Sequence, residues 1–112
     1  MAQTEHSIQN DVLRHLSGMD LRVWRQNVGV AVPLTPTVRA ALRNIEHRIV
    51  RFGIPGAADL TGILPDGRRL EVEIKTAIGR QSQQQERFEA MITRFGGLYI
   101  VARGVDDLRG IS

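Results

Sequence analysis

Residues 57–75, "AADLTGILPDGRRLEVEIK", contain two strand-like segments separated by the turn sequence "PDG". The segments 57–64 and 68–75 are both typical of strands. The proline suits the second position of a type I turn, the aspartate the third, and the glycine the left-handed position that follows. A loop of this length pairs Leu64 with Arg68. The stretch therefore predicts an antiparallel hairpin whose register is set by its turn.

The predicted hairpin separates an apolar face from a charged one. Side chains alternate along a strand, so Glu71, Glu73 and Lys75 share one face. The opposite face is expected in the core, and it carries Leu70, Val72 and Ile74. The register also places Asp59 directly opposite Glu73, with Cβ atoms about 4.5–5.5 Å apart. A loop of two residues would instead turn Asp59 to the other face.

Two opposed carboxylates repel each other, and a divalent cation between them would remove the repulsion. Mg²⁺ binds few carboxylates and takes its other ligands from waters and phosphate oxygens. We expect Asp59, Glu73 and the backbone carbonyl of Ile74 to form such a site, where the metal would assist phosphodiester hydrolysis. The alternative is a solvated strand face with ordinary cross-strand pairs. The small residues of "GIPGAA" before Asp59 leave room for a ligand and favour the metal site.

Lys75 is the only lysine among the 15 cationic residues of the chain, and the other fourteen are arginines. A position that required only positive charge would accept arginine. A lysine can orient an attacking water or exchange a proton with it, whereas arginine is planar and stays protonated. The sequence therefore predicts a chemical role for Lys75.

The composition is that of a small globular protein. With 112 residues, the chain is predicted to form a single domain over 1–112. It has no cysteine, no apolar run long enough to span a bilayer and no signal-peptide pattern in "MAQTEHSIQN", so we expect a cytoplasmic protein without a membrane partner. The net charge of +3 and the pI of about 10.5 suit an anionic partner such as nucleic acid.

Two helices are predicted on either side of the hairpin in the chain. Thr4 can cap a helix that ends before Gly18, and Ser82 can cap a second one that ends before "GG". Their apolar stripes are Ile8, Val12, Leu13 and Leu16 in the first, and Phe88, Met91, Ile92 and Phe95 in the second. Trp24 is predicted to lie in the core rather than to form a base-stacking platform.

Further strands are predicted at 21–27, at 48–52 and at 98–102, the last as a central, buried strand. Residues 33–45 are ambiguous between a loop and a short helix. A short helical turn closes the chain in "VDDLRG". The order of elements indicates a small α/β fold.

The stretch "GIPGAADLTGILPDGRRLEVEIKTAIGRQSQQQERF" resembles the PD-(D/E)xK nuclease superfamily, and within it the VRR-NUC family in its standalone phage and bacterial form. "TEHSIQNDVLRHL", "VWRQNVG" and "GGLYIVA" are similar to the first helix, the next strand and the last strand of that family. Only residues 30–47 match poorly. The resemblance implies a restriction-endonuclease-like αβββαβ core, with a mixed sheet flanked by helices.

The resemblance also implies site residues. The motif acids correspond to Asp59 and Glu73, the motif lysine to Lys75, the glutamine of the next helix to Gln85, and the acid of the first helix to Glu5. One departure is visible, because the motif proline lies four positions before the acid. Glu5 is alternatively a first-turn glutamate favoured by the helix dipole, and Gln85 a capping amide.

The family implies Mg²⁺- or Mn²⁺-dependent hydrolysis of DNA, and its standalone members imply a homodimer that cuts branched DNA in a bacterial or phage-infected cell. Phosphate contacts are expected from Arg25, Asn27, Arg51 and Arg80. A solvated surface position explains Arg25 and Asn27 equally well, and it explains Arg51 and Arg80 better when each is taken singly. We therefore expect a structure-selective endonuclease acting on four-way junctions. The alternatives are a flap or other branched-DNA nuclease, a catalytically silent nucleic-acid-binding module, and a dimeric structural protein held by ion pairs.

Overall fold

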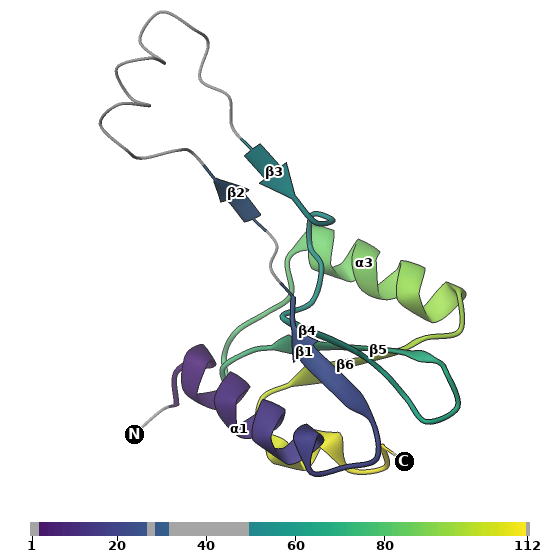
Figure 1. Ribbon diagram of the computed structural model, residues 1–112. Helices are drawn as coiled ribbons and strands as arrows, with labels where there is room; N and C mark the ends of the chain where they lie inside the picture. The colour runs from purple at the N-terminus through teal and green to yellow at the C-terminus, as the bar shows by residue number, and fades with distance from the viewer. Residues whose placement is uncertain (1–2, 27–28, 32–49, 112) are drawn as a thin grey trace, which may run out of the picture.

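The computed structural model describes residues 3–26, 29–31 and 50–111. Its elements are α1 (Glu5–Ser17), β1 (Arg22–Arg25), β2 (Gly29–Ala31), β3 (Val50–Phe52), β4 (Leu60–Ile63), β5 (Arg69–Ile74), α3 (Gln83–Arg94), β6 (Leu98–Ala102) and the 3₁₀ helix η1 (Val105–Leu108). Four strands form a mixed sheet in the order β1-β4-β5-β6, in which only β5 and β6 are parallel (Figure 1). Strands β2 and β3 form a separate antiparallel pair. The predicted α/β class is confirmed.

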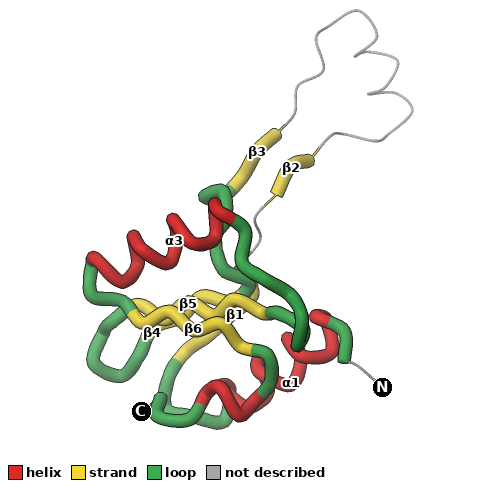
Figure 2. The backbone as a smooth tube through the Cα atoms, turned by 180° about the vertical axis from the view of Figure 1, so that it is seen from behind, coloured by secondary structure: helices red, strands yellow, loops and turns green. Residues whose placement is uncertain are grey.

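The mixed sheet lies between two helical layers, with α3 on one face and α1 on the other (Figure 2). The apolar faces of β4 and β5 point towards α1, as their alternation predicts. The main core contains Ile8, Val12, Leu16, Leu60, Leu64, Leu70, Val72, Ile74, Ala102, Leu108 and Ile111. A smaller cluster under α3 contains Ala58, Phe88 and Ile92. No described helix is long and apolar enough to cross a membrane.

Both helices begin at the predicted caps. Oγ1 of Thr4 accepts a hydrogen bond from the backbone N of Ser7 at 3.1 Å, and Oγ of Ser82 accepts one from the backbone N of Gln85 at 3.1 Å. These bonds satisfy backbone donors that have no partner within the helix. Gly96 follows α3 with a φ of 85°, a left-handed conformation that stops a helix. The two predicted helices are therefore confirmed.

Three strands, β1, β4 and β5, are shorter than predicted, β6 has the predicted bounds 98–102, and one strand was not predicted. β2 arises in the apolar run "VGVAVPL" and pairs with β3. The ambiguous segment 33–45 lies outside the described residues. The predicted helical turn near the C-terminus is present as η1.

The prediction that residues 98–102 form a central strand is wrong. β6 lies at an edge of the sheet, and β5 separates it from β4. The apolar run has another cause, because Leu98 and Ile100 pack against the main core while Tyr99 packs against the cluster under α3. Both faces of this edge strand are thus covered.

Three large apolar side chains that were predicted to be buried are exposed. Trp24 is 50 % exposed, and Met91 and Phe95 at the end of α3 are also exposed. Helix α3 packs against β6 and buries only its Phe88–Ile92 side. No described helix covers β1 on that face of the sheet, so Trp24 stays partly in solvent.

Replacing Gly56 with alanine is expected to lower the free energy of unfolding by at least about 2 kcal/mol. Gly56 has a φ of 81° in the "GIPG" turn, and an added Cβ would lie 2.4 Å from the backbone C and O of Gln84. The alanine would therefore have a strained backbone conformation, and its Cβ would also push the first turn of α3 away. Urea denaturation measures the loss.

The matched control is Gly67→Ala. Gly67 has a similar φ of 91°, but no described atom lies within 4 Å of the added Cβ. This variant isolates the left-handed strain, about 1 kcal/mol. Equal losses in the two variants would refute the importance of the contact between the turn and α3.

Candidate active site

The hairpin between β4 and β5 has the predicted register. Leu60 pairs with Val72, and the turn closes with the backbone N of Gly67 donating to the carbonyl of Leu64 at 2.9 Å. The positive φ of Gly67 is the left-handed position that the "PDG" sequence required. The turn chemistry thus determines which side chains of the two strands share a face.

Asp59 lies one residue before β4, beside the end of β5. Its Oδ2 accepts a hydrogen bond from the backbone N of Ile74 at 2.8 Å. Its carbonyl oxygen accepts one from the backbone N of Gln26 at 2.9 Å, which continues the pairing of β1 with β4. Asp59 is therefore anchored on both sides, with its carboxyl group beside that of Glu73.

Glu73 is the buried centre of the site. The residue is only 3 % exposed. Its Oε1 accepts a hydrogen bond from Nε2 of Gln85 at 2.8 Å, and Nζ of Lys75 lies 3.8 Å from the same oxygen. Its Oε2 is buried without a hydrogen-bond partner among the described residues. One carboxylate oxygen is therefore held in place while the other remains available for a ligand.

The surroundings of Glu73 disfavour its charged form. Burial is the largest cause and the neighbouring Asp59 the next, and together they raise the pKa of Glu73 to about 8. The charge of Lys75 acts in the opposite direction, and the charge of Glu5 adds to the increase. Without a cation, Glu73 therefore holds a proton at neutral pH.

Gln85 combines two roles that the sequence left as alternatives. Its Oε1 accepts a hydrogen bond from the backbone N of Ser82 at 2.8 Å, which completes a capping box. Its Nε2 is then free to donate to Glu73. The cap of α3 thus orients the amide towards the candidate site.

Glu5 is exposed in the first turn of α1. Its charge reaches Glu73, but no hydrogen bond joins it to Asp59, Glu73 or Lys75 among the described contacts. The structure therefore brings Glu5 near the acids without contact. Ile74 uses its backbone N to hold Asp59, and the role of its carbonyl stays a prediction.

Two features of the site were missed by the sequence analysis. Arg103 donates from Nη1 to the carbonyls of Thr76 and Gly79, at 2.5 and 2.7 Å, and so holds the loop after Lys75. Glu71 is fully buried rather than solvated. No sequence pattern near either residue could have predicted these features. Arg103 lies 24 to 27 residues beyond its partners, and Glu71 is buried by the tertiary fold.

The four predicted nucleic-acid contacts are only partly described. Arg25 is exposed, and its Nη2 donates to Oδ1 of Asn10 at 2.7 Å, on the α1 side of the sheet. Arg80 is exposed in the loop that follows Lys75. Asn27 and the side chain of Arg51 lie outside the described part of the chain.

The donor set fits a small divalent cation. No group of three or more His, Cys, Asp or Glu is placed to hold a metal within the described ranges. The available protein ligands are therefore the carboxylates of Asp59 and Glu73, including the buried oxygen of Glu73 that has no partner in the described part of the chain. Few carboxylates, with the remaining positions left to water and substrate oxygens, are the pattern that Mg²⁺ uses.

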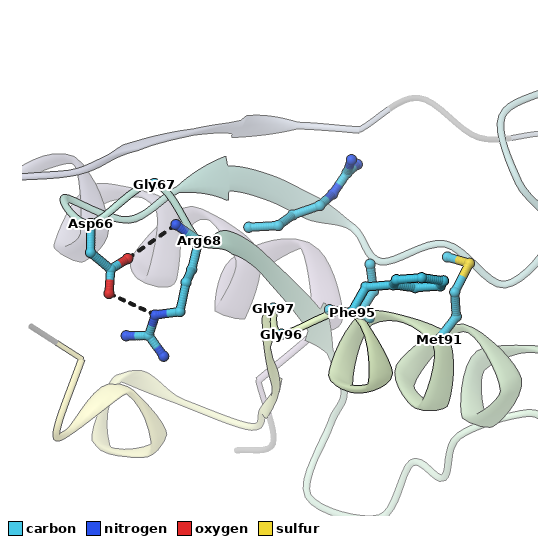
Figure 3. A pocket seen from close by; sticks show the side chains of 9 residues that line it. Asp66, Gly67, Arg68, Met91, Phe95, Gly96 and Gly97 are labelled. Carbon is cyan, nitrogen blue, oxygen red and sulfur yellow. Dashed lines mark hydrogen bonds and ion pairs between the residues drawn. The ribbon is translucent and has the colours of Figure 1, made fainter.

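A cavity of about 570 Å³ lies elsewhere, between the β4–β5 turn and the C-terminal end of α3 (Figure 3). The turn side carries the ion pair of Arg68 with Asp66, and the helix side carries Met91 and Phe95. No acid of the candidate site lines this cavity. We therefore assign it no part in the chemistry.

Comparisons with known proteins add no relative. No family model matches the chain, and searches of curated proteins and of solved structures found no significant similarity.

Proposed function

We propose that the chain is a divalent-metal-dependent, structure-selective DNA endonuclease of the standalone VRR-NUC type within the PD-(D/E)xK superfamily. The order of α1, β1, β4, β5, α3 and β6 supports a restriction-endonuclease-like αβββαβ core. The observation that carries the proposal is the convergence of Asp59, Glu73 and Lys75 with Gln85 at one end of the sheet.

Each residue has a role in this proposal. Mg²⁺ or Mn²⁺ held by Asp59, Glu73 and the carbonyl of Ile74 would offset charge on the phosphodiester. Gln85 holds one oxygen of Glu73, so the other, which has no partner among the described residues, would be left for the metal. Lys75, whose side chain is 13 % exposed, orients the attacking water and exchanges its proton. Glu5, which is exposed, adds negative charge at the edge of the candidate site.

The rival that explains the charged residues as structural ion pairs is less well supported. The ion pairs of Arg68 with Asp66 and of Arg109 with Asp106 are exposed, and such pairs contribute little stability. Within the described ranges, Asp59 has no ion pair with a cationic side chain. The buried Glu73 beside the half-buried Asp59 costs stability, which favours a binding role over a structural one.

The protein is expected to cut DNA only with Mg²⁺ or Mn²⁺, and to cut four-way junctions in preference to linear duplex. The test incubates end-labelled junction, flap and linear DNAs of matched length with each metal and with a chelator. Faster cleavage of flaps than of junctions would keep the nuclease and change its substrate. Metal-dependent binding without cleavage of any DNA would instead favour the silent module.

A homodimer is part of the same proposal. Two active sites related by a two-fold axis match the paired strands of a four-way junction, and two-fold dimers are the commonest assembly. The segment 30–47, suggested by its apolar "VGVAVPL" to contribute to the interface, lies mostly outside the described residues. Sedimentation at micromolar concentration is expected to find a dimer, and a monomer would remove the basis for junction selectivity.

A further inference from the structure

An exposed strip of the sheet lies beside the candidate active site. Trp24 and Ile63 are each 50 % exposed on the face that carries Asp59 and Glu73. At the opposite edge of the same face, Tyr99 of β6 packs edge-to-face on Phe88 of α3, with ring centroids 6.3 Å apart. Helix α3 thus covers the β6 side of the face and leaves the β1–β4 side open.

The strand register connects this strip with the candidate site. Trp24 pairs with Thr61, and Thr61 pairs with Glu71. Two residues further along β4 and β5, the neighbouring row contains Asp59 and Glu73. A rise of two residues is roughly 6.4–6.8 Å, so along the strand direction the indole lies one row of side chains from the acids.

Arg69 is anchored beside the indole. Its Nε donates to Oε1 of the buried Glu71, and its Nη2 donates to Oγ1 of Thr61 at 3.3 Å. The guanidinium is thereby held along the sheet, although its side chain remains 55 % exposed. Together these groups line a cavity of about 300 Å³ formed by Trp24, Thr61, Gly62, Ile63, Gly67 and Arg69.

We propose that Trp24 and Arg69 form a platform that stacks an unpaired base of the DNA next to the scissile phosphate, an inference that rests on the proposed nuclease function. Indole rings stack on any base, and arginine adds a cation–π contact and binds phosphate. The charge of the strip favours a nucleotide, because Arg22 is also exposed on this face of β1. Base pairs at a branch point open more readily than those within a continuous duplex, so the platform would select branched over continuous duplex.

Trp24 is the only tryptophan in the chain, so its fluorescence reports the platform directly. With a chelator present and therefore without cleavage, a short oligo-dT is expected to quench Trp24 emission saturably. An abasic oligonucleotide of the same length carries the phosphates without bases and is expected to leave the emission nearly unchanged. No quenching by oligo-dT, or equal quenching by both, overturns the proposal. Emission that changes on dilution without DNA also overturns it, because a second copy of the chain would then cover Trp24.

Variants separate stacking from general affinity. By fluorescence anisotropy of labelled oligo-dT, Trp24→Ala is expected to weaken binding about 5-fold or more, and Trp24→Phe to retain most of it. The matched control is Phe95→Ala, which removes another exposed aromatic ring that does not line the cavity of Trp24, and should not change binding. Equal losses in Trp24→Ala and Phe95→Ala would contradict the platform.

The stacking platform and the nuclease activity are contradicted by different experimental outcomes. Quenching by oligo-dT without cleavage of any DNA would retain the platform and remove the nuclease. Metal-dependent cleavage without base-dependent quenching would retain the nuclease and remove the platform. Asp59→Asn is expected to lose cleavage while its Trp24 emission is still quenched.

Discussion

Replacing Lys75 by arginine is expected to reduce the rate of DNA cleavage by at least about 100-fold, although the positive charge is retained. Nζ of Lys75 lies 3.8 Å from Oε1 of Glu73 in a mostly buried position. A guanidinium is planar, larger and permanently protonated, so it can neither fit the same space nor exchange a proton with the attacking water. Single-turnover cleavage of the preferred DNA with Mg²⁺ measures the effect.

The same experiment includes two loss-of-function variants and one control. Lys75→Ala and Asp59→Asn are each expected to abolish cleavage, with the fold checked by circular dichroism. Arg109→Lys also replaces one cationic residue with another, but in an exposed ion pair with Asp106, and it should leave cleavage unchanged. Full activity in Lys75→Arg would mean that the lysine acts only as a counter-charge, and our explanation of the single lysine would be wrong.

Replacing Glu73 by glutamine is expected to stabilise the metal-free protein at pH 8 by about 1–3 kcal/mol, with little effect at pH 5. Burial and the neighbouring Asp59 raise the pKa of Glu73 from 4.5 to about 8. The folded protein therefore binds this proton more tightly than the unfolded chain does. Its stabilising effect is fully present below about pH 4.5 and is lost as the pH rises to about 8, whereas glutamine stays neutral throughout.

Thermal unfolding from pH 5 to pH 8, with and without Mg²⁺, tests this prediction. Mg²⁺ at pH 8 should raise the Tm of the parent protein, because an ion that binds only the folded state stabilises it, and should have little effect on Glu73→Gln. Glu86→Gln alters an exposed acid of α3 and serves as the control. A metal-free stability that does not change between pH 5 and pH 8, or an equal response of both proteins to Mg²⁺, would contradict the predicted site.

Local chemistry explains why part of this site was predictable. The "PDG" turn determines the register of β4 and β5, because the left-handed conformation at Gly67 suits a loop of three residues. That register alone brings Asp59 to the face of Glu73 and Lys75. The capping box of α3 is equally local, since Ser82 and Gln85 are three residues apart.

Long-range packing explains the predictions that were wrong. The apolar run of β6 indicated a central strand. The position of β6 beside β5 is instead determined by the connection through α3, because parallel strands need a crossover, and the residues of β6 do not contain this information. The exposure of Trp24 and Phe95 depends on which strands α3 covers, and no pattern within either segment contains that information.

The sequence by itself determined the two helices, the hairpin register and the shared face of Asp59, Glu73 and Lys75, because each follows from contacts between residues close in the chain. Only the tertiary structure decided that Glu73 is buried with one oxygen unpartnered among the described residues, that Gln85 reaches it, and that Trp24 remains exposed on the same face of the sheet. Burial depends on the position of α3 over the sheet. The raised pKa of Glu73 follows from that burial, so it could not be read from the order of the residues.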